Sequence, residues 1–349
     1  MASTDDIISK AEAILASAKK FKGDRAERHD LMKQVDLLYL QLEDPMDAIR
    51  LMRILTSTGI IELTGEDTYA HTPKSRAYLD GAAMDFFNLC INMFGCYLTW
   101  PDYFKTRTPE ELIDLRKTPY TFAYGQEGQT FYEVLTADKD RFNMFNKAMM
   151  QQEASLPTLG MFPFTSLKEE VEAEPDRALV VDIGGGRGQS LLLIQKEIAG
   201  TFGKGSKMVL QDRPQVLDTI PQELLPGIEK MPYDFYTEQP VKNAHIYFLR
   251  RIIHNYQDNV CHTILKIIAA AMSPKSRLLI GEVIVPARTQ IGEDLSTYWM
   301  DMVMISIGGK ERSEKEFVAL LEGAGLVLYK IWPYAVGNQA MIEARLKSA

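Results

Sequence analysis

A histidine lies in the stretch FLRRIIHNYQDN, residues 248–259, which begins apolar and then turns basic. His254 is followed directly by Asn255. An imidazole has an ordinary pKa near 6.5 and accepts a proton at neutral pH, so His254 is a candidate general base. The same residues also fit a second interpretation, in which His254 only caps a strand or a helix.

Glycines and an acid form a second chemical signal, in VVDIGGGRGQS at residues 180–190. Asp182 ends a strand pattern, and Gly184 and Gly186 lie in the turn before a helix pattern. Glycines let the backbone approach a ligand closely. The nicotinamide fingerprint needs a glycine where this chain has Gln189. A carboxylate beside the loop repels a pyrophosphate but suits a ligand with an ammonium group; a plain tight turn is the alternative.

A second acid follows the next strand pattern, in LQDRP. Asp212 stands at the carboxyl end of that strand, where doubly wound folds place an acid that accepts hydrogen bonds from ribose hydroxyls. Asp212 also fits a helix N-cap before Pro214, and the two roles are compatible. The loop, the acid and the strand order together indicate an adenosine-containing cofactor. Asp182 favours S-adenosylmethionine over a nicotinamide dinucleotide.

Strand and helix patterns alternate from about Ala178 onward, which predicts a mostly parallel sheet with helices on both faces. Only the four residues AVGN separate the last two strands, so these must pair antiparallel as a hairpin. The predicted strands span residues 178–184, 207–212, 244–250, 276–285, 326–334 and 339–346.

The chain before about residue 152 is mostly helical. A helix is expected to begin at Asp44–Pro45 and to end at Gly59, and two short strands around the turn TGED follow it. A helix with a small hairpin is typical of a winged helix. Such a unit serves either DNA binding or packing and dimerisation.

Composition limits the functional classes. The 349 residues carry a net charge of −8, which argues against nucleic-acid binding and so against a winged-helix regulator. The three cysteines include no C-x-x-C pair, and no apolar run is long enough to cross a membrane. We expect a reduced, soluble, cytoplasmic protein without a metal ion.

Several motifs together resemble the S-adenosylmethionine-dependent O-methyltransferases of the plant caffeate type and of fungal secondary metabolism. They are VVDIGGGRGQS, LQDRP, YDFYT, FLRRIIHNY, LLIGEVIVP and GGKERSEKEFVALLEGAGL. The resemblance implies a winged-helix dimerisation and substrate-lining domain at residues 1–152. It also implies a Rossmann-like catalytic domain at residues 153–349, with a seven-stranded, mostly parallel sheet that ends in the antiparallel hairpin. A homodimer is implied as well.

The resemblance assigns roles to individual residues. His254 would be the general base, and Glu282 and Glu311 would flank and orient it. The implied cofactor residues are Asp182, Gly184, Gly186, Asp212, Arg213, Asp234, Phe235 and Arg250. The implied acceptor residues are Phe145, Met149, Trp299, Met302 and Ser306, all equally compatible with a role in the core.

The implied reaction is methyl transfer to a hydroxyl, expected to be phenolic, of a small aromatic or polyketide-type metabolite, with S-adenosylhomocysteine as product. The family usually has Asp directly after the base, whereas this chain has Asn255. Relatives with this fold also carry out pericyclic reactions, so a cofactor-binding enzyme that does not methylate is the alternative.

Overall fold

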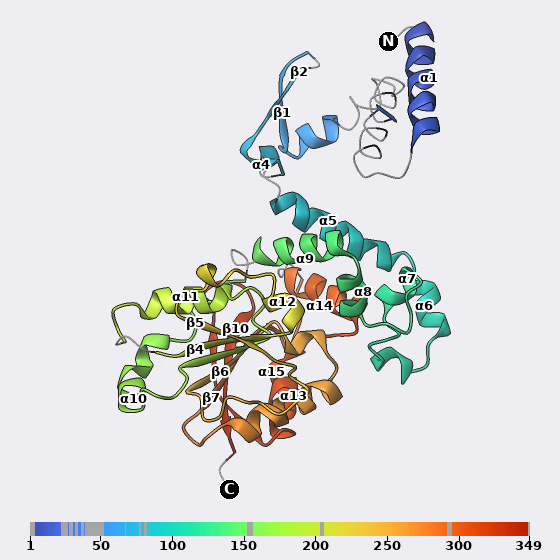
Figure 1. Cartoon of the computed structure of the whole chain (residues 1–349). Coiled ribbons are helices and arrows are strands. Elements are labelled where there is room, and N and C mark those ends of the chain that lie inside the picture. Colours follow the sequence, from blue (N-terminus) through green and yellow to red (C-terminus); the bar gives the residue numbers. More distant parts are fainter. Residues whose placement is uncertain are drawn as a thin grey trace. The chain divides into compact units, whose positions relative to one another are not determined.

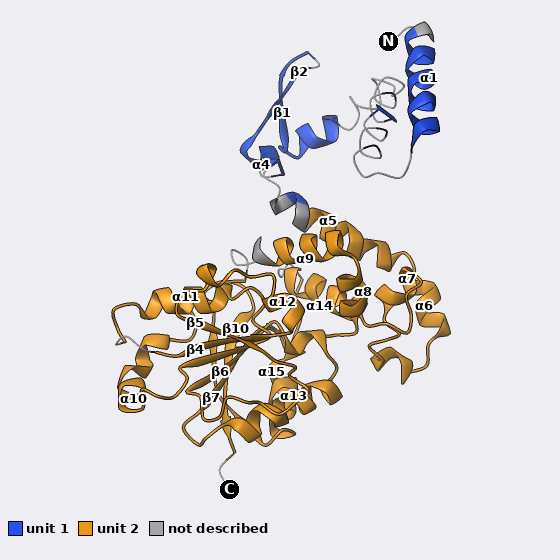
Figure 2. Ribbon diagram, viewed as in Figure 1, with its two compact units in different colours: residues 1–84 blue, residues 85–349 orange. Residues whose placement is uncertain are grey.

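The computed structural model describes most of the chain in two compact units, residues 1–84 and 85–349 (Figure 2). The described residues are 4–21, 52–66, 68–76, 78–79, 82–151, 156–202, 206–291 and 295–347, with single positions between 27 and 38. The two compact units divide between residues 84 and 85, and the domain boundary expected between residues 152 and 153 stays a prediction.

The first unit contains helix α1 (Thr4–Lys20), the short helix α4 (Pro73–Arg76) and a hairpin of β1 (Ile61–Gly65) and β2 (Thr68–His71). The strands pair antiparallel, as expected from the turn between them. Residues 52–57 are helical, and Gly59 adopts a left-handed φ of 69° after them, at the predicted end of the helix. The expected start at Asp44–Pro45 lies outside the described residues, and the winged helix stays a prediction.

The second unit is built on a sheet with the strand order β5-β4-β3-β6-β7-β10-β9 (Figure 1). The first five strands in this order are parallel, and β10 lies antiparallel between β7 and β9. The predicted terminal hairpin and the mostly parallel, seven-stranded sheet are confirmed; an additional two-residue strand, β8, pairs with β7. The bounds are β3 Val180–Ile183, β4 Met208–Asp212, β5 Ile228–Pro232, β6 Ile246–Arg250, β7 Arg277–Val285, β8 Arg312–Ser313, β9 Leu326–Pro333 and β10 Gln339–Leu346.

Alternate residues of the central strands feed two separate cores, because successive side chains of a strand point to opposite faces. Tyr247 and Leu249 pack with helices α13 (Asp258–Ala271) and α15 (Glu314–Glu322). Ile246 and Phe248 pack on the other face with α10 (Lys168–Ala173), α11 (Gln189–Ile198) and α12 (Pro214–Leu217). Both faces of the sheet are therefore covered.

A third core joins helices that precede the sheet to α14 (Ser296–Ile307), with Met93, Tyr120, Phe131 and Met304 among its buried members. The helices before the sheet are α5 Ala82–Tyr97, α6 Trp100–Thr106, α7 Pro119–Ala123, α8 Phe131–Ala137 and α9 Lys139–Gln151. The 3-10 turns are η1 Glu111–Ile113, η3 Phe164–Leu167, η4 Gln222–Leu224 and η5 Ile253–Asn255. This core brings α8, α9 and α14 together within the second unit.

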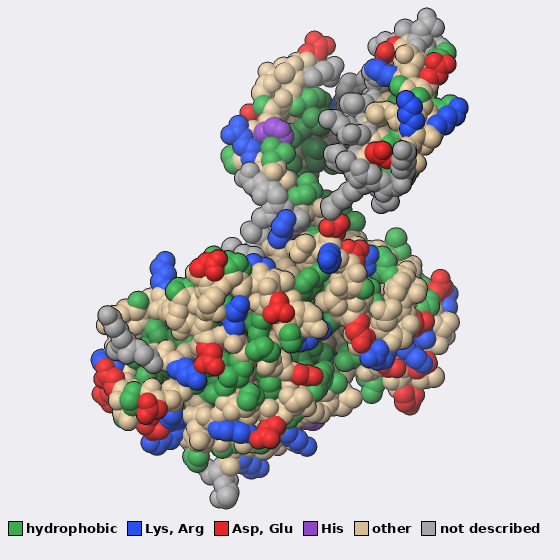
Figure 3. Space-filling model, viewed as in Figure 1, with side chains coloured by type: hydrophobic (Ala, Val, Ile, Leu, Met, Phe, Trp, Pro, Cys, Tyr) green, Lys and Arg blue, Asp and Glu red, His purple; other side chains and the backbone are tan. Residues whose placement is uncertain are grey.

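The surface of the second unit carries charges of both signs. Figure 3 shows acidic and basic side chains interspersed with apolar ones on the face that it draws. Among the described residues, no helix has both the length and the apolar character that crossing a bilayer requires. Cys90, Cys96 and Cys261 are free thiols.

Candidate active site

His254 lies in turn η5, directly after β6, and only 5% of its surface is exposed. Its Nδ1 donates a hydrogen bond to Oε1 of Glu311 at 2.8 Å. Oε2 of Glu282 lies 3.4 Å from the same nitrogen. The structure therefore brings together the three residues predicted as the catalytic set. Both carboxylates face Nδ1, which leaves Nε2 as the nitrogen that can accept a proton from a bound molecule.

The Glu282 carboxylate organises the turn that carries the histidine. Glu282 lies in β7, next to β6, and is almost fully buried. Its Oε1 accepts hydrogen bonds from the backbone N–H groups of Ile252, Ile253 and His254 at 3.1, 3.0 and 3.3 Å. The three amide donors stabilise the buried negative charge of Glu282. The same hydrogen bonds fix the backbone turn that carries the imidazole.

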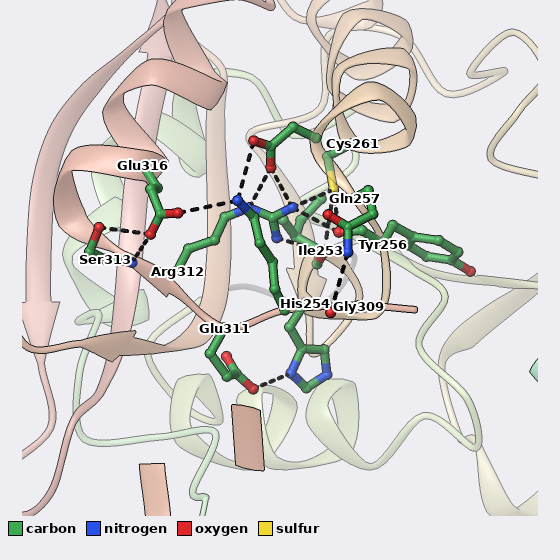
Figure 4. A network of polar contacts seen from close by, with 12 residues as sticks. Ile253, His254, Tyr256, Gln257, Cys261, Gly309, Glu311, Arg312, Ser313 and Glu316 are labelled. Carbon is green, nitrogen blue, oxygen red and sulfur yellow. Dashed lines mark hydrogen bonds and ion pairs between the residues drawn. The ribbon is translucent and has the colours of Figure 1, made fainter. Parts of the chain in front are cut away.

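Arg312 ties the segment that carries Glu311 to the segment that carries His254, as Figure 4 shows. Its buried guanidinium donates to the carbonyls of Ile253 and Tyr256 at 3.0 and 2.7 Å and to Oδ1 of Asp258 at 2.7 Å. The sequence analysis missed this residue. Its only signal was its place next to Glu311, because a buried arginine looks like a surface residue in sequence.

Two further contacts hold the Glu311 loop in place. The backbone N–H of Glu311 donates to Oδ1 of Asp301 in α14 at 2.8 Å, and the N–H of Lys310 donates to the carbonyl of His254 at 2.9 Å. A Cβ atom on Gly309 would lie 2.1 Å from that carbonyl oxygen, so the close approach requires glycine. Asp301 and Gly309 are also positions that the sequence analysis did not single out.

The electrostatics of the set favour a proton on the imidazole. Burial alone would lower the pKa of His254, but the charges of Glu282 and Glu311 outweigh it and raise that pKa above its usual value. Burial raises the pKa of Glu282, against the lowering effect of His254. His254 and Glu282 therefore shift each other's pKa: the carboxylate raises that of His254, and the imidazole lowers that of Glu282.

The same three residues could also coordinate a cation. Among the described residues, His254, Glu282 and Glu311 form a group whose ligand atoms all lie within 4.8 Å of one another. Nδ1 of His254 already donates to Glu311, and Oε1 of Glu282 already accepts three amides. A metal ion would have to displace the bond between His254 and Glu311, so the observed geometry is that of a hydrogen-bonded base.

The glycine loop and two acids meet at the carboxyl edge of the sheet. Oδ2 of Asp212 accepts a hydrogen bond from the N–H of Gly186 at 2.9 Å, and a Cβ on Gly186 would meet only open space. Asp182 is 1% exposed, and its Oδ2 has no hydrogen-bond partner among the described residues. Burial raises the pKa of Asp182 to about 7. An open backbone loop and an unpartnered buried carboxylate fit a ligand that brings an ammonium group.

The other predicted cofactor residues also follow strand ends. A Cβ on Gly184 would lie 2.7 Å from Ile252 and 4.0 Å from Phe235, so the loop packs closely there. Asp234 follows β5 and accepts from the N–H of Tyr236 at 3.0 Å. Arg250 ends β6, and its guanidinium donates to the carbonyl of Leu156.

Arg213 extends from the edge of the sheet toward α8. Its guanidinium carbon lies 5.9 Å from the ring centre of Tyr132. Burial raises the pKa of Tyr132 to about 12, against the lowering effect of Arg251 and Arg213. Tyr132, which no motif indicated, lies on α8 beside Arg213.

A small pocket beside the base has a lining that differs from the predicted acceptor residues. It is lined by Leu156, Arg251, His254, Gly281, Glu282, Val283, Met300, Glu311 and Gln339. Of the five predicted acceptor residues, Met149 contacts this lining, since its Sδ lies 3.7 Å from Nη2 of Arg251. Phe145 packs 6.0 Å from Phe131, measured between ring centres.

The remaining predicted acceptor residues lie on α14. Trp299 packs against Phe94, and the hydroxyl of Ser306 donates to the carbonyl of Met302 at 3.2 Å. Neither interaction reaches the base. The acceptor roles of these residues stay predictions.

Asn255, the departure from the family pattern, has a structural role. It is 8% exposed, and its Nδ2 donates to the carbonyl of Arg251 at 2.9 Å. An ionised Asp could only accept hydrogen bonds and could not make this contact. The amide therefore fastens the turn before the base.

Known O-methyltransferases are similar to this chain. Residues 106–327 match the model of the O-methyltransferase domain family. The chain is 45% identical to O-methyltransferase hmp5 of Hypomyces subiculosus over the whole of both chains. It is 35% identical to O-methyltransferase kntB of Aspergillus niger over 85% of this chain and 71% of the relative.

Solved structures share the fold. OxaC matches with a TM-score of 0.75 and 29% identity, covering 98% of this chain and 99% of that one, and has been solved in complex with SAH and oxaline. A pericyclic reaction enzyme matches with a TM-score of 0.76 at 23% identity, covering 99% of this chain and all of that one.

The raised pKa of Asp182 predicts a pH-dependent stability. The folded protein holds this proton up to about pH 7, whereas an unfolded Asp releases it near pH 3.9, so the contribution of Asp182 to stability falls as pH rises between these values. The full effect is at most about 4 kcal/mol. We expect melting temperatures from pH 5 to pH 8 to fall more steeply for the wild type than for Asp182→Asn. Asp176→Asn, at an exposed aspartate, should follow the wild type; parallel curves for all three proteins would contradict the assignment.

Proposed function

The chain belongs to the S-adenosylmethionine-dependent O-methyltransferase family, and on that premise we propose that it methylates a phenolic hydroxyl of a small aromatic or polyketide-type secondary metabolite, with His254 as the general base. The observation that carries the proposal is the bond between His254 Nδ1 and Glu311. It fixes the tautomer with a proton on Nδ1 and so makes Nε2 the proton acceptor.

The residues of the site act on the acceptor hydroxyl. A free phenol has a pKa near 10 and is mostly neutral at pH 7, so proton removal makes it a better nucleophile. Nε2 accepts this proton as the bond to oxygen forms, and Glu311 stabilises the resulting imidazolium. Glu282 keeps the turn rigid through the three amides, which holds the imidazole in one orientation.

The cofactor residues each bind a different part of the cofactor in this proposal. S-adenosylmethionine, when bound, supplies an electrophilic methyl group and leaves as S-adenosylhomocysteine. We assign the ammonium of its methionine part to Asp182, backbone contacts with its methionine and ribose parts to Gly184 and Gly186, and the ribose hydroxyls to Asp212. The hydrogen bond from Gly186 to Asp212 supports this assignment, because it holds the carboxylate at the mouth of the loop.

Non-methylating chemistry on this fold is the second candidate. The structural match to a pericyclic reaction enzyme is the reason to consider non-methylating chemistry, but at 23% identity that match concerns the fold alone. The complete set of His254, Glu282 and Glu311 favours methyl transfer, because a pericyclic reaction needs no base of this kind.

We further propose that two copies of the chain pair through α5. Apolar side chains recur along one face of this helix and just beyond it at helical spacing, and they are exposed: Phe87 47%, Ile91 52%, Phe94 50% and Leu98 86%. A stripe of large exposed apolar residues is costly in water unless another surface covers it. The winged helix would belong to the same dimerisation region, and the three free thiols fit a reducing cytoplasm.

Incubation with methyl-labelled S-adenosylmethionine and a panel of phenols tests the reaction. We expect labelled methyl ethers and an equal amount of S-adenosylhomocysteine. His254→Ala should lower kcat on the order of 100- to 10,000-fold while cofactor affinity, measured by titration calorimetry, changes less than about threefold. Turnover of a metabolite without S-adenosylhomocysteine would support the pericyclic alternative, and full activity of His254→Ala would remove the base assignment.

The charge of Glu311 should set the pH profile. Neutral His254 is the active form, so kcat/KM should rise as the pH passes through the raised pKa of His254. Glu311→Gln removes one of the charges that raise it, and the acidic limb should move to lower pH while the plateau falls about 10- to 100-fold. Glu314→Gln, three residues along and exposed, serves as the control. An unmoved limb in Glu311→Gln would refute this coupling.

Sedimentation velocity tests the pairing of two copies. The wild type should sediment at about twice the chain mass of 39.5 kDa. Leu98→Glu should shift the protein toward the single-chain mass, because it places a charge in the proposed interface. A wild type that sediments as a single chain at all micromolar concentrations tested would contradict the proposal.

A further inference from the structure

Arg251 has a backbone conformation that is unusual for its side chain. Its φ is 58°, in the left-handed region that residues other than glycine rarely adopt. Two hydrogen bonds hold it there: its own N–H donates to the carbonyl of Gly281 at 3.1 Å, and its carbonyl accepts from Asn255 at 2.9 Å. The chain therefore maintains a strained residue three positions before the base.

This conformation places the guanidinium in the pocket beside the base. Arg251 lines that pocket with His254, Glu282 and Glu311. Among the residues that the structure describes, its Nη2 donates only to the weak acceptor Sδ of Met149, at 3.7 Å, and its buried Nε has no hydrogen-bond partner. Within the described part of the chain, no carboxylate lies within 4.0 Å of the guanidinium. The guanidinium thus has unused donors in the pocket beside the base. The same pocket contains Oε2 of Glu282 and Oε2 of Glu311, two buried acceptors without a hydrogen-bond partner among the described residues.

The neighbouring charges do not satisfy this group. Arg250 lowers the pKa of Arg251, and Glu282 and Glu311 raise it without pairing with the guanidinium directly. Oε1 of Glu282 accepts from three backbone amides, and Oε1 of Glu311 accepts from His254. Burial lowers the pKa of Arg251 to about 10, which still leaves it charged at neutral pH. A desolvated guanidinium with unused donors forms its strongest bond with a planar oxyanion, which it can bind in two places at once.

We propose that Arg251 is the binding subsite for a carboxylate on the acceptor, so that the preferred substrate class is an aromatic hydroxy acid. The inference rests on the proposed function and narrows its substrate. The carboxylate stays unchanged in the reaction: the hydroxyl loses its proton to His254 and gains the methyl group. Asn255 is a positioning residue here, because it holds the carbonyl of Arg251 and Asp could not.

Binding to the enzyme loaded with S-adenosylhomocysteine tests the subsite. The probes are 2,4- and 3,4-dihydroxybenzoate and their methyl esters, which differ only in the charge of one group. Titration calorimetry should show at least one acid binding about 10- to 100-fold more tightly than its ester. Arg251→Met should remove that preference by weakening the acid and leaving the ester within about threefold, whereas Arg251→Lys should retain part of it.

A matched control is Arg345→Met. Arg345 lies near the C-terminal end of β10, opposite Val327 of β9, and pairs with Glu343 at 2.6 Å, so its loss should leave the preference for the acid unchanged. Melting temperatures and affinity for S-adenosylhomocysteine show whether each variant is folded. Should Arg251→Met fail to fold, Arg251→Lys and the wild-type comparison of acid with ester decide the question.

The outcomes separate this inference from the proposed function. The inference is overturned if no acid binds more tightly than its ester, if neither binds, or if the preference survives in Arg251→Met. An equal loss of kcat on acids and esters in that variant also overturns it, because Arg251 would then act on the reacting oxygen. Failure to transfer labelled methyl to any probe counts against the proposed function, while the binding preference still reports on Arg251.

Discussion

The geometry of the active site depends on the Glu282 carboxylate and the three amides that it binds. A buried charge without such partners would cost several kcal/mol, and three amides at the end of a strand would be left without acceptors. β6 cannot satisfy them itself, because the left-handed Arg251 turns the chain away from the ladder. The carboxylate of the neighbouring strand completes the turn, and the position of His254 follows from that contact.

The two carboxylates beside the histidine have different surroundings and therefore different uses. Glu282 is neutralised mainly by backbone dipoles and acts as scaffold, whereas Glu311 pairs directly with the ring. The loop of Glu311 is in turn held by Arg312, Asp301 and the glycine that permits close packing. The base is thus positioned by contacts between two segments far apart in sequence. Each segment is held in place by its own set of hydrogen bonds.

Local patterns in the sequence predicted most of the sheet. Six strands and the closing hairpin followed from runs of apolar residues and from the shortness of the AVGN connection. β5 was missed because it is an edge strand with Glu229, Lys230 and Pro232 among its five residues, a composition that protects an edge but hides the strand. The winged region could not be judged beyond its hairpin, since much of it lies outside the described residues.

Site residues whose type the chemistry restricts could be predicted from the sequence. Site residues whose role depends on packing in the folded chain were harder to predict. His254, Glu282 and Glu311 came from motifs, and they meet in the structure. Arg251 and Arg312 lie within two of the motifs and Tyr132 lies outside them, but no pattern assigned any of the three a role. Their importance arises from burial beside charges that only the folded chain brings near. Asn255, a departure from the family pattern in sequence, is explained by one donor atom that Asp lacks.

The place of β10 has a consequence for synthesis of the protein. β10 pairs with β7, with Gln339 opposite Val283, and Gln339 also lines the pocket. While a ribosome is still making residues 286–338, the free edge of β7 has no antiparallel neighbour and the pocket lacks one wall. The nascent chain then presents an unpaired apolar strand, the kind of surface that chaperones bind.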